Sequence, residues 1–330
     1  MEPRLLEPQL DVYLTWDAER LPAYGDRVVA VLLGDETARI PRYTPRVHAV
    51  FKAYGVRPQI PGRLRDAGAR VALAQLLQQA VRWGRWVPGG AAHARERMAR
   101  RLRCEPYPAG ILTIPLGTFN QVDLPVPPMR ERTVDLAFAG SVEHSGSWRQ
   151  RLASPKVQAR REMLAAVRAL AARRPGLRVD LRVTGSFKAS EATSPTEYSA
   201  SLVAARICLA PRGTSAETFR VLEGLRAGCI VISDRLPRRA FYDGSPVIQL
   251  DRWDGLAEVV EPLLADPGEL ARRQAAGLAW WRERCSEEAV GAALARRLNA
   301  LTWPRAGQID PPRGPRSGGY PTDATARRPP

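Results

Sequence analysis

The sequence predicts an α/β protein, and three observations support this class. Runs typical of strands alternate with runs typical of helices along most of the 330 residues, a pattern that favours α/β architecture over all-helical or all-β folds. From residue 134 onward the alternation becomes a regular β-α-β-α succession, which predicts a parallel, doubly wound sheet. Since 45% of the residues are hydrophobic, the chain can bury one large core or two ordinary ones.

The N-terminal part predicts short strands with irregular connections. Its expected strands are short apolar runs at 11–15, 27–33, 47–54 (which could also be a short helix) and 111–115. Helical periodicity over 64–83 predicts a helix that closes near Pro88-Gly89-Gly90, and a second helix is expected over 91–103.

The proline-rich stretch 124–132 marks a change in pattern. We therefore predict one domain over 1–130 and a second over 131–303. The expected strands of the second are 134–139, 177–184, 206–210, 229–233 and 247–250. Its expected helices are 157–172, 196–205, 218–227, 256–264 and one or two more within 269–301. The stretch 304–330 holds seven of the 29 prolines and one large aliphatic residue, Ile309; we expect a disordered tail.

Composition indicates a cytoplasmic protein. The longest apolar stretches are too short to cross a bilayer, and the N-terminus has no basic segment followed by an apolar core, so no secretion signal is expected. None of the four cysteines forms a CxxC pair, and Cys208 and Cys229 lie in apolar runs where a reduced thiol behaves as a small hydrophobe.

The net charge of +16 raises the question of a nucleic-acid partner. Of the 50 basic residues only Lys52, Lys156 and Lys188 are lysines, and the arginines are spread evenly along the chain. Such a distribution indicates that most of the arginines lie on solvated helix faces. Their charge would attract phosphates, sugar nucleotides and anionic lipid surfaces in general. We expect no specific nucleic-acid partner, although a non-enzymatic polyanion-binding protein stays the alternative from another functional class.

The segment 207–234 (ICLAPRGTSAETFRVLEGLRAGCIVISD) carries the clearest chemical signal. A buried strand leads to Pro211-Arg212-Gly213 at the carboxyl edge of the sheet, where ligands bind in open α/β folds. Gly213, Thr214 and Ser215 offer backbone N–H groups ahead of a helix, an arrangement that favours anions.

Arg220 and Glu223 lie three residues apart and face the same side of that helix. The arginine can bind a diphosphate, and the glutamate can accept hydrogen bonds from ribose hydroxyls or hold an arginine. Alternatively the two form a surface ion pair that contributes only about 0.3–0.5 kcal/mol.

This segment resembles the signature of exostosin-type glycosyltransferases. The resemblance rests on Pro211-Arg212-Gly213, on Phe219-Arg220-Val221-Leu222-Glu223-Gly224-Leu225 and on Ala227-Gly228-Cys229. It covers about residues 134–250 and is faint before them. Val231 stands where the family usually has proline.

The resemblance implies a GT-B fold, in which two Rossmann-like domains face each other across a cleft. It implies transfer of a sugar from a nucleotide-diphosphate-sugar donor, held by the second domain, to a glycan or lipid-linked hydroxyl acceptor on the side of the first. Polysaccharide or surface-glycan synthesis in bacteria is the expected setting. A sugar-nucleotide epimerase or phosphorylase on the same scaffold is the alternative among enzymes. The donor-binding residues expected are Arg212, Gly213, Thr214, Ser215, Phe219, Arg220 and Glu223.

Further rim residues follow two other strands. Gly140-Ser141 and Gly185-Ser186 each come directly after a strand, so both pairs are expected at its carboxyl edge. Small residues there let a ligand approach the backbone, and tight turns without a ligand are the equal alternative.

A catalytic base is also required, because transfer to a hydroxyl removes a proton. In GT-B enzymes that invert the anomeric centre this base comes from the N-terminal domain. Asp35 and Glu36 follow a strand of that domain, and Glu36 is the first choice because its longer side chain reaches further. A capping Asp35 with a solvated Glu36, and His48 as the base, are the alternatives.

No cofactor and no metal are expected. The sequence has no Asp-x-Asp motif after a strand and no His/Cys/Asp cluster with ligand spacing. Arg212 and Arg220 could supply the positive charge that a divalent metal supplies elsewhere, so activity should be metal-independent.

A patch of Trp83, Arg85, Trp86 and the arginines up to Arg103 could contact a membrane surface or an anionic acceptor. Packing of the same residues against the other domain is equally compatible with the sequence.

Overall fold

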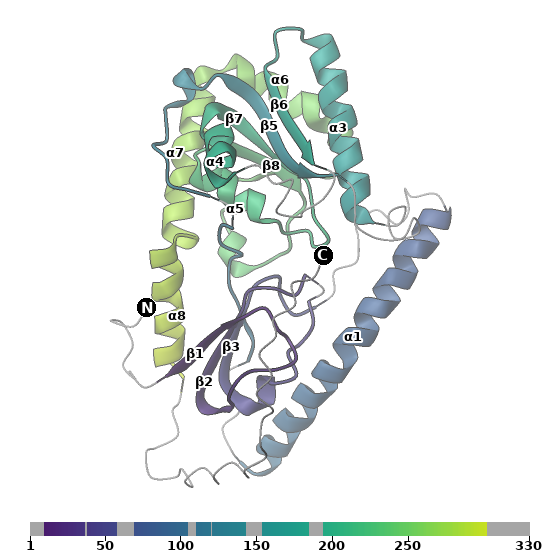
Figure 1. Ribbon diagram of the computed structural model, residues 1–330, viewed down its shortest axis with the longest axis vertical. Helices are drawn as coiled ribbons and strands as arrows, with labels where there is room; N and C mark the ends of the chain where they lie inside the picture. Colours follow the sequence, from purple (N-terminus) through teal and green to yellow (C-terminus); the bar gives the residue numbers. More distant parts are fainter. Residues whose placement is uncertain are drawn as a thin grey trace, which may run out of the picture.

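Two parallel β-sheets form the centre of the molecule, one above the other in Figure 1, as a computed structural model shows. The structure describes residues 10–36, 38–57, 69–104, 110–119, 121–142, 154–184 and 194–301. The predicted α/β class, with parallel strands in two units, is confirmed. The predicted tail 304–330 lies outside the described residues.

The N-terminal sheet has the order β1-β2-β3-β4, and every pair is parallel. Its strands are β1 (Asp11–Thr15), β2 (Gly25–Leu32), β3 (Val47–Lys52) and β4 (Leu112–Thr113). Their apolar runs form strands because β2 and β3 occupy the middle of the sheet, where the side chains of Val29, Ala30 and Phe51 are almost fully buried. The ambiguous run 47–54 is therefore a strand, and the run 111–115 pairs over only two residues.

Helix α1 (Ala69–Leu102) corrects one prediction, because it continues through Pro88-Gly89-Gly90 where a break was expected. A Cβ on Gly89 would collide with the carbonyl oxygen of Ile40, and one on Gly90 would come within 2.9 Å of the Trp86 ring. These glycines thus let the helix pack closely against Ile40 and the Trp86 ring, and they do not end the helix. Pro88 removes one backbone hydrogen bond, a loss the packed 34-residue helix tolerates.

The C-terminal sheet has five parallel strands in the order β6-β5-β7-β8-β9. These strands are β5 (Val134–Ser141), β6 (Val179–Thr184), β7 (Ala205–Ala210), β8 (Ile230–Asp234) and β9 (Ile248–Leu250). The predicted parallel, doubly wound sheet is confirmed. Because the strand order reverses between β5 and β7, the carboxyl edge between them is the topological switch point, where such sheets bind ligands.

Helices cover both faces of this sheet. Alternate residues of each strand divide between the faces: Leu136, Phe138 and Ile207 pack with one group of helices, and Ala137 and Cys208 with the other. The first face carries α3 (Pro155–Arg173) and α6 (Leu256–Ala265), and the second carries α4 (Pro195–Ala204), α5 (Phe219–Arg226) and α7 (Pro267–Arg284). Short 3₁₀ turns lie at Thr44–Arg46, Met129–Glu131, Ala240–Tyr242 and Trp253–Gly255.

The two sheets share one hydrophobic core cluster, which holds Val29 and Phe51 together with Val221 and Leu222. Helix α8 (Glu287–Asn299) lies beside the N-terminal sheet (Figure 1), and its Leu298 belongs to the same cluster. The division of the chain at residue 130 stays a prediction. Within the described residues, no helix combines the length and apolar character needed to span a bilayer.

Candidate functional site

Arg220 crosses the switch point of the C-terminal sheet. It lies in the first turn of α5 and donates from Nη2 to the carbonyl oxygen of Ala139 in β5, while its guanidinium carbon lies 4.8 Å from the centre of the Phe138 ring. Gly140 makes this possible: its φ is +152°, and a Cβ there would come within 2.5 Å of the Arg220 Nη2 atom. Gly140 therefore lets a cationic side chain approach the strand end.

Arg212 follows β7 on the other side of the switch point. Its backbone N–H donates to Asp234 Oδ2 at 2.8 Å, which fixes the loop to the end of β8. Burial lowers the pKa of its side chain. The Nε atoms of Arg212 and Arg220 are both buried, and neither has a hydrogen-bond partner among the described residues. Buried donors without a partner are costly, so these two atoms are available for an anionic ligand.

Three further cations that the sequence analysis missed converge on the same edge. Arg160 of α3 donates from Nε to the Arg212 carbonyl oxygen at 3.3 Å and from Nη1 to the Ser141 carbonyl oxygen. Lys156 of α3 donates to Ser141 Oγ at 2.8 Å, and Arg82 of α1 donates to the Thr214 carbonyl oxygen at 3.4 Å. We call Arg82, Lys156, Arg160, Arg212 and Arg220 the cationic cluster.

A sequence signal for Arg160 existed. It is 6% exposed and occupies a position on the apolar stripe of α3, with Met163, Leu164 and Val167 three, four and seven residues later. A charge on a buried stripe indicates a role beyond solubility. Arg82 gave no such signal, because only the packing of α1 turns its side chain towards the C-terminal sheet.

The electrostatics of the cluster favour an anion. Burial, followed by the charge of Arg220, lowers the pKa of Arg160. Burial, then the charge of Arg160, lowers the pKa of Lys156 to about 8. None of the five cationic groups lies within ion-pair distance of a carboxylate among the described residues. A bound diphosphate would supply the missing negative charge.

Glu223 and Phe219, both predicted to bind the donor, lie next to the cluster and contact protein groups. Glu223 is 4% exposed; Oε1 accepts from the Phe119 backbone N–H at 3.1 Å and Oε2 from the Tyr198 hydroxyl at 2.6 Å. The ring of Phe219 lies 6.3 Å from that of Tyr54 and 5.6 Å from that of Phe119. Arg220 thus contacts the switch point, while Glu223, one turn later on α5, contacts the segment that connects the two sheets.

The remaining rim residues are placed as follows. Gly213 lies in the loop after β7, where a Cβ would make only ordinary contact with Thr218 at 3.5 Å. Ser215 is 8% exposed, and its Oγ accepts from the Glu217 backbone N–H at 3.4 Å. Gly185 and Ser186 lie outside the described residues.

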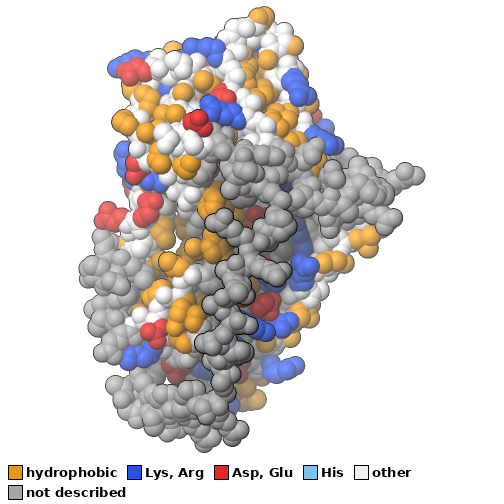
Figure 2. Space-filling view, viewed as in Figure 1, with side chains coloured by type: hydrophobic (Ala, Val, Ile, Leu, Met, Phe, Trp, Pro, Cys, Tyr) orange, Lys and Arg blue, Asp and Glu red, His pale blue; other side chains and the backbone are white. Residues whose placement is uncertain are grey.

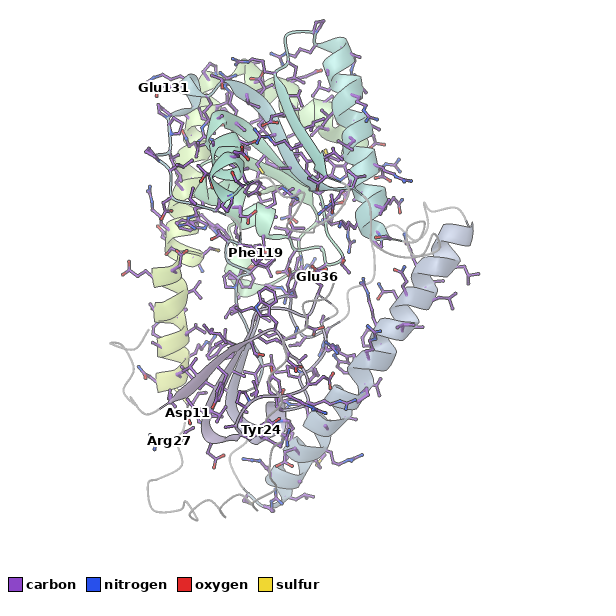
Figure 3. The ribbon with its side chains drawn as sticks, viewed as in Figure 1. Asp11, Tyr24, Arg27, Glu36, Phe119 and Glu131 are labelled. Carbon is purple, nitrogen blue, oxygen red and sulfur yellow. The ribbon has the colours of Figure 1, made fainter. Side chains whose placement is uncertain are left out.

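Glu36 faces the cationic cluster from the N-terminal unit. Figure 3 shows it, with Phe119, in the region between the two sheets. Glu36 is exposed, and its charge acts on Arg82, Lys156 and Arg160, whose pKa values it raises against the effect of burial. An exposed carboxylate beside an anion site is suitably placed to accept a proton from a second substrate.

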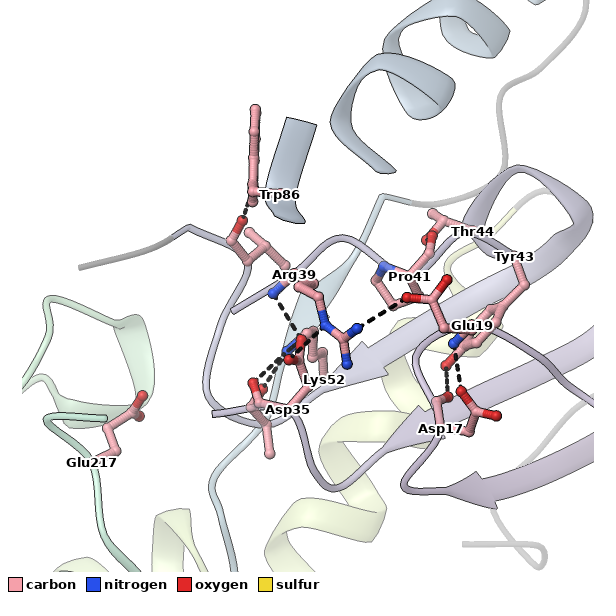
Figure 4. A network of polar contacts seen from close by, with 12 residues as sticks. Asp17, Glu19, Asp35, Arg39, Pro41, Tyr43, Thr44, Lys52, Trp86 and Glu217 are labelled. Atoms are coloured by element: carbon pink, nitrogen blue, oxygen red, sulfur yellow. Dashed lines mark hydrogen bonds and ion pairs between the residues drawn. The ribbon is translucent and has the colours of Figure 1, made fainter. Parts of the chain in front are cut away.

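Asp35 has a different environment (Figure 4). Its side chain is 1% exposed and pairs with Lys52 Nζ at 3.1 Å and Arg39 Nε at 3.0 Å, and it also accepts from the Arg39 backbone N–H at 2.7 Å. Burial lowers the pKa of Lys52, and the nearby charge of Asp35 acts in the opposite direction and raises it. Asp35 has a φ of +70°, so its ion pairs hold an unusual turn that presents Glu36.

His48 lies at the other end of its strand. It is the second residue of β3, four residues before Lys52, which corresponds to about 13 Å along a strand. It is 5% exposed, and burial lowers its pKa, partly offset by the charge of Asp26. Asp35 and Glu36 therefore lie together in the turn after β2, and His48 lies towards the opposite edge of the sheet.

No group of three His, Cys, Asp or Glu side chains within the part of the chain that the structure describes could hold a metal ion. Metal independence stays a prediction. The buried cysteines behave as predicted small hydrophobes: Cys208 and Cys229 are 0% and 1% exposed, and burial raises the pKa of both thiols.

Comparison with known proteins gives structural likenesses only. No protein-family model and no curated protein matches the chain. Among solved structures, S. aureus TarM bound to fondaparinux, α-GlcNAc-glycerol and UDP is similar with a TM-score of 0.47 and 8% identity, over 84% of this chain and 56% of TarM. The GtfA/B complex gives 0.45 and 11%, over 84% and 58%.

WaaG, a glycosyltransferase involved in lipopolysaccharide biosynthesis, gives a TM-score of 0.40 and 15% identity over 85% of this chain and 79% of WaaG. The chain spans less than three fifths of the length of TarM and of the GtfA/B chain. These TM-scores lie below 0.5.

Proposed function

We propose that the protein is a glycosyltransferase that moves a sugar from a nucleotide-diphosphate-sugar donor to a hydroxyl acceptor. The cationic cluster at the switch point carries this proposal: five cations lie without a described carboxylate partner at the edge where doubly wound sheets bind nucleotides. Two of them, Arg212 and Arg220, belong to the segment that resembles exostosin-type enzymes with the GT-B fold.

The cluster would hold the diphosphate and stabilise the charge that develops on it as the sugar leaves. Charge-assisted hydrogen bonds from guanidinium groups suit this purpose. Arg212 and Arg220 offer their buried Nε atoms, while Arg160 and Lys156 add charge from α3. These cations would supply the positive charge that a metal supplies elsewhere, so we infer metal-independent transfer.

Glu36 would act as the general base on the acceptor hydroxyl. It is exposed and lies on the N-terminal side of the cationic cluster, so an acceptor placed there would approach the sugar from the side away from the leaving phosphate. Such an approach inverts the anomeric centre. The acceptor we propose is a glycan or lipid-linked glycan of bacterial polysaccharide or surface-glycan synthesis, and the site of action is the cytoplasm.

Matched arginine variants test the site. A thermal-shift panel of UDP, GDP, ADP and CMP selects the ligand, and calorimetry then compares Arg160→Ala with Arg161→Ala. The two arginines are neighbours on α3, yet Arg160 is buried and Arg161 is exposed. We expect Arg160→Ala and Arg220→Ala to weaken binding at least tenfold, about the loss of one charge-assisted hydrogen bond, and Arg161→Ala to leave it unchanged. Equal affinities in all variants would refute the site.

A further inference from the structure

Helix α1 exposes its apolar side chains and turns polar ones towards the body of the protein. The exposed residues include Leu73, Leu76, Leu77, Val81, Trp83, Val87, Met98 and Leu102, each at least 38% exposed. At about 100° per residue these eight side chains fall within an arc of about 160°. Because amphipathic helices of globular proteins normally direct such an arc at the core, the orientation of α1 is inverted.

Polar contacts fix this orientation on the inner side. Gln75 and Gln79 are buried, and Gln75 bonds to Gln158 of α3 at 3.2 Å. Arg82 reaches the Thr214 carbonyl oxygen, and Trp86 donates to the Val56 carbonyl oxygen at 2.6 Å. Of the two tryptophans in the patch suggested by the sequence, Trp86 therefore packs inward and only Trp83 points outward.

The exposed arc is long and has a basic border. From Leu73 to Leu102 it extends over about 44 Å. Four arginines of the same helix are exposed: Arg85 and Arg97 lie just outside the arc, Arg101 at its edge and Arg95 within it. The only acidic residue of α1 is Glu96. Figure 2 shows orange and blue side chains next to each other along α1. An apolar surface this large marks an interaction site, and its arginine border selects an anionic occupant.

We propose that α1 docks the protein on an anionic membrane surface, with the apolar arc inserted among the lipid headgroups. Leu, Val and Trp side chains on one face, with arginines along its border, are the composition of helices that lie in the membrane interface. Net charge of +16 adds attraction to such a surface. The inner face of the same helix carries Arg82 of the cationic cluster, so docking would hold the candidate site close to the membrane.

Vesicle flotation with the full chain tests the proposal. The probes are vesicles of phosphatidylcholine alone and vesicles with about a third phosphatidylglycerol. We expect flotation with the anionic vesicles only, and a marked loss at 1 M NaCl, where charges separated by more than about 3 Å are screened. The double variant Leu76→Glu/Leu77→Glu should bind the anionic vesicles at least tenfold more weakly.

Two matched variants test whether binding depends on the apolar arc, on the arginines or on any added negative charge. Val183→Glu introduces a carboxylate at a 50% exposed apolar position of β6 and should leave flotation unchanged. Arg95→Ser/Arg101→Ser keeps the apolar arc and should weaken binding about fivefold for each arginine removed. Circular dichroism and nucleotide binding, which should be the same in all variants, show that they fold and keep the C-terminal site.

Three outcomes would overturn the proposal. In the first, wild-type protein fails to float with anionic vesicles, and in the second, the Leu76→Glu/Leu77→Glu variant floats as well as wild type. In the third, light scattering finds a dimer that the double variant dissociates, while neither protein binds vesicles; a second copy of the chain then covers the arc. Nucleotide binding is measured separately, so failure of membrane docking leaves the proposed transferase function standing.

Discussion

Lys156 is the member of the cationic cluster whose charge changes closest to neutral pH. Burial and the charge of Arg160 lower its pKa to about 8. The side chain is therefore cationic at pH 7 and mostly neutral at pH 9. A bound diphosphate stabilises the cationic form, and the terminal phosphate, with a second pKa of about 6, is already mostly ionised in this range.

We expect the affinity for the selected nucleoside diphosphate to fall about tenfold between pH 7 and pH 9, the effect of losing one charge-assisted hydrogen bond. Calorimetry in matched buffers measures it. Lys156→Met removes the charge while keeping most of the side chain, so its affinity should be low at pH 7 and nearly independent of pH. An unchanged pH dependence in that variant would assign the effect to another group.

Glu36 is the proposed general base. Glu36→Gln keeps the size and polarity of the side chain but removes the basic oxygen, so we expect turnover to fall about 10²–10⁴-fold. Donor affinity should hold or rise slightly, because a negative charge beside Arg82, Lys156 and Arg160 is lost.

Asp35→Asn is the informative neighbour of Glu36. It leaves Lys52 buried without its ion-pair partner, so it should lower the melting temperature, which Glu36→Gln should not. If Glu36→Gln keeps near-normal turnover, Glu36 is not the base. His48 then becomes the next candidate, although it lies four residues along β3 from Lys52, which pairs with the neighbour of Glu36.

At the scale of elements, helix α5 packs on the sheet through Gly224. A Cβ there would come within 2.8 Å of Val231 Cγ2 and 3.1 Å of Cys208 Cβ, in a core where both partners are buried. Gly224→Ala gains about 1 kcal/mol of helix propensity but overpacks the core, which costs about 1–3 kcal/mol. We expect a net loss of unfolding free energy and a displaced Arg220.

Gly84→Ala is the control for that substitution. Gly84 lies on the exposed side of α1, and a Cβ there would meet nothing within 4 Å. Only the propensity gain applies, so this variant should be more stable than wild type by up to about 1 kcal/mol. Urea unfolding compares the two, and greater stability of Gly224→Ala would contradict the close packing of α5 on β7 and β8.

At the scale of the whole molecule, the proposed metal-independent transfer can be tested on the full chain. The cationic cluster supplies several positive charges at the switch point, so transfer should continue after dialysis against EDTA. Turnover with and without EDTA, and after addition of Mg²⁺ or Mn²⁺, is the measurement. Complete loss with EDTA that either ion reverses would show that a metal contributes to the leaving-group charge.

Local patterns in the sequence were enough to predict the α/β class, the parallel direction of the C-terminal strands and the segment that carries Arg212 and Arg220. Each of these follows from local periodicity or from residues adjacent in sequence. The apolar runs at 11–15 and 134–139 need no distant partner to be recognised, and the strand–loop–helix pattern around Arg212 specifies which edge of the sheet it occupies.

Tertiary packing determines which side chains join that segment and which way α1 faces. Arg82, Lys156 and Arg160 meet Arg212 and Arg220 because α1 and α3 pack against the switch point, and contacts across 52 to 132 residues leave no trace in local pattern. The periodicity of α1 defines an apolar arc but not its direction. Its outward orientation results from Gly89 against Ile40 and Gln75 against Gln158, since hydrogen bonds and close backbone contact hold the polar face inward.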